Sequence, residues 1–411
     1  MIDMVGFLKA LKGNPKVCLS TDPLWAAAFN MYLPFVTLYM FSLGLGDVEI
    51  GWLLSAGMFF QFIMALLSGV ITDKFGRRKT LIISDFVAWN IPALIWAFSQ
   101  NFWWFLAAAI FNSVSQIGMV SFECSWVDDI EEHKLSKTIN WFHINWLTTV
   151  FFALISGYLV EQFSVVPVMR GLYLFAFVSW LIRVVILKVC IKETNRGKER
   201  MEATKDKSIL QLLSGYKEVF FQIIRSRRMR RVLILLPMVS IFQMVTGTFF
   251  ALYATQNLGI GEYFLAYFPV IRAGVALVFY FFVQTRLDRF NPRHLMGIGL
   301  ILYVAGHVLL LTAPPQNIIW LIAYALMDAW AAALFLPRLD ALMFSSIDAT
   351  ERARCRALIS VIVLAVTSPF GILAGFLSDM DRRLPFTLNI LLFICMIGFV
   401  LSNRRSKEGV T

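Results

Sequence analysis

The sequence predicts an all-α membrane protein that crosses a lipid bilayer with twelve helices. Hydrophobic residues make up 59% of the chain and charged residues only 15%, and the mean hydropathy is +0.71. A soluble domain carries about 25% charged residues, so this chain has too little polar surface to cover a water-soluble globule. Apolar runs of about 20 residues, the length that spans a bilayer, recur from Pro23 to Leu401. Several tryptophans lie at the ends of these runs, where amphipathic rings favour the membrane interface: Trp52, Trp103, Trp104 and Trp320.

Charged and turn-forming segments separate the apolar runs and set the expected helix limits. Turn sequences occur at Gly44 to Asp47, at Gly259 to Gly261, at Asn291-Pro292 and at Pro314-Pro315. The expected spanning helices cover residues 22–44, 49–71, 78–99, 102–126, 139–162, 168–191, 231–256, 262–284, 294–313, 317–345, 355–378 and 384–402.

The placement of basic residues predicts the orientation of these helices. Most of the 37 Lys and Arg fall on one side of the membrane when both termini are placed in the cytoplasm, and 13 of them lie between Lys188 and Arg231. Basic loops resist translocation, so we expect a multi-pass protein of the plasma (inner) membrane with both termini cytoplasmic. The net charge of +11 is then an orientation signal, and no nucleic-acid partner is expected.

The sequence offers little support for other classes of membrane protein. The first 20 residues lack the compact apolar core and cleavage site of a signal peptide, so the first helix is expected to direct insertion. The five cysteines and four histidines show no metal-binding spacing, and His307 is expected to be a hydrogen-bonded core residue. No HExxH, Gly-x-Ser-x-Gly or GxxxxGK(S/T) motif is present. We therefore expect no enzyme, no ATP-driven pump, and no metal or cofactor.

One long hydrophilic segment divides the chain into two sets of six helices. The expected domains are an N-terminal bundle at 1–191, a cytoplasmic central loop at 192–230 and a C-terminal bundle at 231–411. Within the loop, apolar residues recur at helical spacing between Ile209 and Ile223. This pattern predicts an amphipathic helix at the inner membrane interface.

The two halves contain related sequences at a shift of 215 residues. Asp, a basic residue, Phe and then Gly or Asn coincide in register, and both Gly and Asn tolerate left-handed turns. Transporters are often built from such repeated bundles. The first copy runs Gly69-Val-Ile-Thr-Asp73-Lys74-Phe75-Gly76-Arg77-Arg78-Lys79, and the second runs Gln284-Thr-Arg-Leu-Asp288-Arg289-Phe290-Asn291-Pro292-Arg293-His294.

With this motif, twelve helices and a long central loop, the chain resembles the major facilitator superfamily over nearly its whole length. The resemblance implies two pseudo-symmetric six-helix bundles, a central cavity lined mainly by the first, fourth, seventh and tenth helices, and alternating access by rocking of the bundles. Two departures matter. The stretch from Phe111 to Gly118 lacks the buried arginine of the drug-exporting branches, and the stretch from Ala153 to Gly157 lacks their Gly-Pro sequence. The usual antiporter assignment is therefore not inherited.

The repeated motif predicts a gate on the cytoplasmic side. Asp73 is expected to accept backbone N–H bonds from a neighbouring helix N-terminus, and Arg77 to pair with Glu123 or Asp128. In the alternative, the basic residues only enforce topology, and Arg338 only snorkels to the interface beside a kink at Pro337. The expected gate residues are Gly69, Asp73, Gly76, Arg77, Asp128, Asp288, Arg338 and Asp340.

Two ionisable residues are expected near the middle of the bilayer. Arg272 and Asp328 each lie about ten residues from the outer ends of their helices, or about 15 Å deep at about 1.5 Å per residue. Charged groups at this depth are costly and are usually functional. Their equal depth allows a pair, in which protonation of Asp328 would release Arg272, and a permanent structural ion pair is the alternative. Glu123 is a second candidate proton carrier.

Uncharged polar residues accompany these groups in the helices that would line the cavity. For each one an interhelical hydrogen bond competes with solute contact as the explanation. The expected solute-cavity residues are Asn30, Tyr32, Asn112, Gln116, Gln243, Thr246, Arg272, Asp328 and Trp330.

The function that these features predict is secondary active transport by a monomer. The expected cargo is a small amphipathic or hydrophobic organic solute, exported by alternating access and coupled to protons. Two alternatives stay open: proton-coupled uptake of a small polar organic solute, and a membrane receptor that binds a ligand without moving it.

Overall fold

The computed structural model describes residues 4–214, 225–287, 289–345 and 352–402, and these residues form helices and short connections with no strand. Among them, twelve helices are long and apolar enough to cross a membrane, as the sequence predicts. The spans are Gly13–Ser42, Asp47–Phe75, Arg77–Ala97, Phe102–Val127, His133–Phe163, Val165–Cys190, Met229–Asn257, Glu262–Val283, Pro292–Leu311, Ile318–Met343, Ala357–Met380 and Leu384–Leu401.

Six of these spans form the N-terminal half, and short irregular turns interrupt several of them. The first span is bent at a 3₁₀ turn that contains Pro34, and the third contains a π-turn at Phe86–Asn90 just before Pro92, in keeping with the missing N–H of proline. The elements are α1 (Met4–Ala10), α2 (Gly13–Tyr32), α3 (Val36–Ser42), α4 (Asp47–Phe75), α5 (Arg77–Asp85), α6 (Ile91–Ala97), α7 (Phe102–Ser113), α8 (Ser115–Val127), α9 (Glu132–Thr149), α10 (Ala153–Phe163) and α11 (Val165–Cys190).

Two short helices follow the first six spans, and the other six spans form the C-terminal half. The short helices are α12 (Asn195–Thr204) and α13 (Ile209–Ser214). The C-terminal half contains α15 (Arg227–Leu252), the 3₁₀ turn η5 (Glu262–Ala266), α16 (Tyr267–Val278), α17 (Gln284–Leu287), α18 (Pro292–Leu311), α19 (Ile318–Ser345), α20 (Arg352–Met380) and α21 (Leu384–Ser402).

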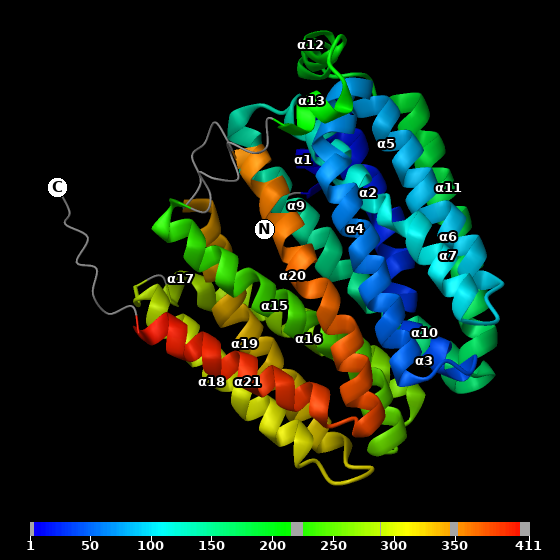
Figure 1. Ribbon diagram of the computed structural model, residues 1–411, viewed down its shortest axis with the longest axis vertical. Helices are drawn as coiled ribbons and strands as arrows, with labels where there is room; N and C mark the ends of the chain where they lie inside the picture. Colours follow the sequence, from blue (N-terminus) through cyan, green and yellow to red (C-terminus); the bar gives the residue numbers. More distant parts are fainter. Residues whose placement is uncertain (1–3, 215–224, 288, 346–351, 403–411) are drawn as a thin grey trace.

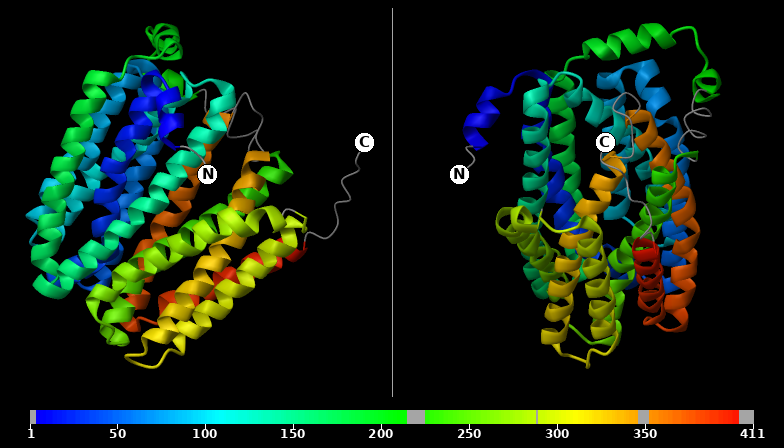
Figure 2. Two further views of the ribbon diagram at one scale, coloured as in Figure 1. Left: turned by 180° about the vertical axis from the view of Figure 1, so that it is seen from behind. Right: turned by 90° about the vertical axis from the view of Figure 1, so that its left-hand side faces the viewer.

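The helices form two bundles that lie closer together at one end than at the other (Figure 1). We call the end that carries α12, α13 and the turn at Gly76 the terminal face, and the end that carries Asp47 and Arg382 the opposite face. The bundles converge at the opposite face and diverge toward the terminal face (Figures 1 and 2). The contacts between the halves agree: α4 packs along α20, α3 packs on α15, and α10 packs on η5 and α16.

The structure differs from the expected helices at the start of the first span and in two short helices outside the spans. The first span begins at Gly13 rather than at residue 22, because Pro23 lies within α2 without ending it. The helices α1 and α12 were not expected, since both are too short or too polar to give an apolar run. Of the amphipathic helix predicted between Ile209 and Ile223, the structure describes α13, and residues 215–224 lie outside the described residues.

Candidate functional site

The predicted ion pair between Arg272 and Asp328 is present in the C-terminal half. Arg272 lies on α16 and Asp328 on α19, and Nε of the arginine is 3.5 Å from Oδ2 of the aspartate. The side chain of Asp328 is 10% exposed, whereas that of Arg272 is 41% exposed. The carboxylate is thus enclosed by the bundle, while part of the arginine side chain stays exposed, and the arginine also lies within electrostatic reach of Tyr303 and Tyr324.

A hydrogen-bonded row of polar side chains lies beside this pair. Nδ1 of His307 is 3.0 Å from the carbonyl oxygen of Tyr303, so Nδ1 donates there. Nε2 then accepts from the Asn389 amide at 3.3 Å, and the same amide nitrogen lies 3.0 Å from the Thr246 hydroxyl. His307 is fully buried and lies within electrostatic reach of Asp328. The expected core histidine is confirmed, and it connects α15, α18 and α21 beside the ion pair.

The other expected cavity residues lie mostly in contacts between neighbouring helices. Asn30 donates to Thr149 at 3.1 Å, Asn112 donates to the carbonyl oxygen of Ala88 at 2.9 Å, and Gln116 reaches Gln61 at 3.5 Å. The remaining three are not brought together: Tyr32 is buried against Tyr173, Trp330 packs its edge on Phe279, and Gln243 is exposed. Of this set only Thr246 is linked to the Arg272–Asp328 region, and solute contact by the others stays a prediction.

A second buried ion pair lies inside the N-terminal half. Arg183 of α11 donates from Nη1 to Oδ2 of Asp85, and its guanidinium carbon lies 5.1 Å from the ring centre of Phe122. Asp22 of α2 is within electrostatic reach of the same arginine. Asp85 is nearer in sequence to the basic residues Arg77 to Lys79, but its partner is this arginine of another span. The signal available in the sequence was an arginine and an aspartate at similar depths in two apolar runs.

Three of the expected gate residues, Asp73, Arg77 and Asp128, form a charged cluster at the terminal face. Arg77 donates from Nη1 to Asp73 at 2.9 Å and from Nε to Asp128 at 3.2 Å, so Asp128 is its partner among the two candidates that the sequence offered. Thr194 also donates to Asp128, at 3.2 Å. Asp73, Arg77 and Asp128 border a cavity of about 260 Å³ whose lining also includes Gly69 and Glu123.

The role expected of Asp73 at a helix N-terminus belongs to Glu193. The two carboxylate oxygens of Glu193 accept the backbone N–H groups of Arg77 and Arg78, each at 3.0 Å, at the start of α5. These N–H groups have no partner within their own helix. Gly76 makes the approach possible, because it has φ +85° and a Cβ there would lie 2.6 Å from Glu193 Oε2. Asp73 binds the side chain of Arg77 instead.

Asp129 at the same face accepts a hydrogen bond and has a raised pKa. Asn14 donates to Asp129 at 2.9 Å and to the carbonyl oxygen of Lys192 at 2.8 Å. Partial burial, and then the nearby charges of Asp128 and Glu193, raise the pKa of Asp129 above its ordinary value of 3.8. The two hydrogen bonds of Asn14 thus join the N-terminus of α2 to the end of α11 and to the turn after α8.

The C-terminal members of the expected gate are arranged differently. Pro337 has no N–H to bond to the carbonyl of Ala333, and Nη1 of Arg338 donates to that oxygen at 3.3 Å and to the oxygen of Leu334 at 2.9 Å. The arginine thus replaces a hydrogen bond that the proline removes. Asp340 is exposed, and Asp288 lies outside the described residues.

The contact between the halves at the opposite face was not expected from the sequence. Asp47 at the start of α4 is paired with Arg382 at 3.0 Å, and Ser378 donates to it at 2.5 Å. One turn further along, Gly51 lies against Gly371 and Gly375 of α20, so closely that a Cβ on Gly51 would be 2.7 Å from the oxygen of Gly371. Small residues four apart let spanning helices approach backbone to backbone. This spacing was the available signal.

Twelve membrane-spanning helices in two halves, a buried ion pair between spans and charged contacts at both faces agree with a membrane transporter of the major facilitator superfamily. The chain belongs to the MFS_1 like family, whose family model matches residues 24–387. No curated protein matches the sequence.

Solved structures share this fold at low sequence identity. The nucleoside transporter NupG, as its D323A mutant, has a TM-score of 0.73 and 13% identity over 95% of this chain and 99% of its own. A POT family transporter in complex with 5-aminolevulinic acid has a TM-score of 0.74 and 12% identity over 94% of each chain. The human organic anion transporter MFSD10 has a TM-score of 0.65 and 14% identity over 94% of this chain and 98% of its own.

Proposed function

We propose that this protein is a secondary active transporter that moves a small organic solute by alternating access and couples its movement to protons. The observation that carries the proposal is the Arg272–Asp328 pair, with its enclosed carboxylate and its partly exposed arginine side chain. Protonation of Asp328 removes its charge and frees Arg272 for a polar group of the solute. Binding of that group in turn weakens the hold of Arg272 on Asp328. Competition for one guanidinium is a physical route to coupling.

The unequal contact between the bundles supports alternating access. If the terminal face is cytoplasmic, as the basic residues predict, the structure corresponds to an inward-facing state. The reverse state requires the Asp47–Arg382 pair to separate, because it joins the two halves at the opposite face. The Asp73–Arg77–Asp128 cluster is then placed to act in closing the terminal face.

Export of an amphipathic solute is the direction and cargo that we favour. The N-terminal half contains a cluster of aromatic rings in which Trp25 contacts Phe29, Trp89 and Trp146 at centroid distances of 4.9, 5.0 and 5.9 Å. Trp146 is 37% exposed, so the cluster offers an aromatic surface to an apolar group.

Uptake of a small polar solute is the second candidate, and the exposed side of Arg272 favours it. Nucleosides, 5-aminolevulinic acid and organic anions, named with the structurally similar transporters, are polar organic compounds of this kind. A receptor that binds without transport would bind a ligand and show no flux.

Proton flux in proteoliposomes tests the proposal. Wild type is compared with Asp328→Asn and Arg272→Gln over a panel of amphipathic and polar solutes, with the exposed Asp379→Asn as a carboxylate control. We expect a solute gradient to drive proton movement in wild type and in the control, and Asp328→Asn to abolish it. Solute movement without a proton signal, unchanged in both variants, would make the pair structural and the protein a uniporter. Binding without flux in wild type would indicate a receptor.

A further inference from the structure

Asp22 of α2 is a carboxylate inside a membrane span that the proposed coupling does not use. Counted from Gly13, where the span begins, Asp22 lies about 14 Å along the helix at about 1.5 Å per residue. Its side chain is partly exposed. Ionisable groups within spans face the interior of the protein or a water-filled space rather than lipid. The exposed part of Asp22 is therefore open to water and to a solute.

The charges around Asp22 do not balance. Among the residues that the structure describes, Arg183 is the charged side chain that acts on Asp22, and its guanidinium donates to Asp85 instead. The thiol of Cys18 lies within electrostatic reach of the same groups and adds no charge at neutral pH. With both carboxylates ionised, the group carries one excess negative charge. Such a charge is costly inside a span, so the group favours a proton or a bound cation.

Asn145 of α9 is held beside Asp22 by a hydrogen bond that a proline makes available. Pro23 has no N–H for the carbonyl oxygen of Leu19, and Nδ2 of Asn145 donates to that oxygen at 3.4 Å. The amide also acts on the carboxylate of Asp22. These contacts set the level at which α9 lies against α2. The next residue of α9, Trp146, therefore meets α2 beyond Asp22.

Aromatic rings continue the exposed side of α2 beyond Asp22. Trp25 and Phe29 follow it at helical spacing, so the three side chains lie on one face of the helix, and all three are partly exposed. The ring centre of Trp146 lies 5.9 Å from that of Trp25 and 5.7 Å from that of Phe29, and Trp146 is 37% exposed. The faces of such rings attract cations within about 6 Å of the ring centre. A carboxylate beside these rings suits an ammonium group with an apolar substituent.

We propose that Asp22 binds an ammonium group of the solute, while Trp25 and Trp146 contact the cation and its apolar substituent. The carboxylate accepts charge-assisted hydrogen bonds from the ammonium group, and the ring faces attract its positive charge. The bound cation neutralises the excess charge and leaves the neighbouring ion pair intact. The proposal rests on the proposed function in naming amines as the transported class. Binding itself requires neither proton coupling nor Arg272.

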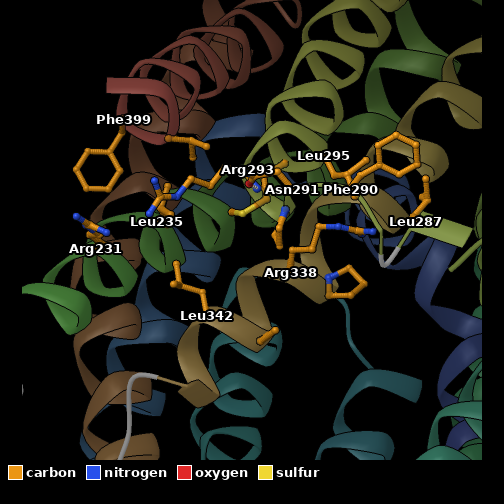
Figure 3. Close-up of a pocket in the computed structure, with 15 residues that line it drawn as sticks. Arg231, Leu235, Leu287, Phe290, Asn291, Arg293, Leu295, Arg338, Leu342 and Phe399 are labelled. Carbon is orange, nitrogen blue, oxygen red and sulfur yellow. Dashed lines mark hydrogen bonds between the residues drawn. The ribbon is translucent and has the colours of Figure 1, made fainter. Parts of the chain in front are cut away.

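Ligand binding to the purified full chain in detergent, measured by isothermal titration calorimetry at neutral pH, tests this proposal. The probes share one carbon skeleton and differ in charge: phenethylammonium, the neutral phenethyl alcohol and the anion phenylpropionate. The site variants are Asp22→Asn and Trp146→Leu. The control Glu161→Gln removes an exposed carboxylate from the same half. The control Leu342→Trp fills a separate cavity of about 580 Å³ in the C-terminal half (Figure 3).

We expect wild type to bind phenethylammonium at least about tenfold more tightly than the alcohol or the anion, since only the cation pairs with Asp22. Asp22→Asn should remove this preference. Trp146→Leu should weaken ammonium binding about threefold, because it removes one cation–π contact. Both controls should keep wild-type affinity. Equal binding of ammonium and alcohol by wild type, or a loss in either control that matches the loss in Asp22→Asn, would overturn the site.

Trp146→Leu keeps the proposal testable if Asp22→Asn impairs folding, because it leaves every charge in place. Unchanged ammonium binding by a folded Trp146→Leu protein would show that the cation does not lie against this ring and would overturn the proposal. The outcomes also separate this site from the proposed function. Ammonium binding without flux in proteoliposomes would support the site and overturn transport. Proton-coupled flux of a solute by a protein with no ammonium preference would overturn the site alone.

Discussion

Arg382 donates from Nε and Nη2 to the two carboxylate oxygens of Asp47, each at 3.0 Å, and so ties the loop after α20 to the first turn of α4. The two residues are 335 positions apart and belong to different halves of the protein. The Asp47 side chain is 4% exposed and that of Arg382 is 24% exposed. A bidentate pair with this degree of burial is stronger than a surface ion pair.

Asp47→Asn is expected to weaken the closed opposite face by about 2 kcal/mol, since removal of one partner leaves the other charge partly buried. Spin labels at two exposed positions report the separation as a distance distribution: Asn101, on the connection before α7, and Ile319, in the first turn of α19. The distribution should shift to longer distances in the variant. The exchange Asp47→Arg/Arg382→Asp should recover part of the short distances, and an unchanged distribution in Asp47→Asn would contradict this role.

Gly375→Ala is expected to disrupt the contact between α4 and α20. Its Cβ would lie 2.9 Å from the oxygen of Asp47 and from Cα of Gly51, so the backbones must separate. Overpacking of this kind costs about 1–3 kcal/mol. We expect it to lower the midpoint of thermal unfolding and to lengthen the distance between the same two spin labels. Gly57→Ala is the control on α4, because its Cβ would make an ordinary 3.7 Å contact with Ala109. Equal effects of the two substitutions would argue against a close-approach role.

Glu193→Gln should destabilise the terminal face by about 1 kcal/mol, the typical worth of a group that caps a helix N-terminus. The neutral amide weakens the interaction with the N–H groups of Arg77 and Arg78 and with the helix dipole. Thermal unfolding in detergent measures the change. Glu199→Gln removes a nearby exposed carboxylate and should have little effect, and a comparable loss in both variants would point to general charge instead.

Asp129 should give the protein a distinct pH response. Its pKa is raised in the folded state, so the protonated form favours folding, and this contribution is lost as pH rises through the raised pKa. Asp129→Asn removes the titration and should therefore gain stability relative to wild type as pH increases from about 4 to about 7. Unfolding midpoints across that range measure the difference. A difference that is constant with pH would mean that the carboxyl does not titrate as the structure indicates.

The parts of the protein that the sequence predicts correctly are those governed by local composition or by depth. Twelve apolar runs determine the twelve spans, because each run is long enough to cross the bilayer by itself. The Arg272–Asp328 pair follows from two charges at equal depth, and the pairing of Arg77 with Asp128 follows from a short motif beside an acidic turn.

The contacts that escaped prediction depend on how separate segments meet. Glu193 lies on the connection after α11 and reaches α5 only after the bundle has formed. Asp85 had loop cations nearer in sequence, but packing of α5 against α11 places Arg183 beside it. Asp47 and Arg382 are in different halves, so no local pattern relates them. The amides Asn30 and Asn112 look alike in the sequence whether they face a solute or a neighbouring helix.

The glycine contact between α4 and α20 has a consequence for the temperature dependence of the conformational equilibrium. Gly51, Gly371 and Gly375 have no rotamers to lose, so their contact forms without side-chain ordering. The neighbouring Asp47–Arg382 pair instead orders an arginine side chain, at up to about 2 kcal/mol in entropy. Because an entropic cost grows with temperature, we expect warming to weaken the ion pair more than the glycine contact, which then supplies a larger share of the closure at the opposite face.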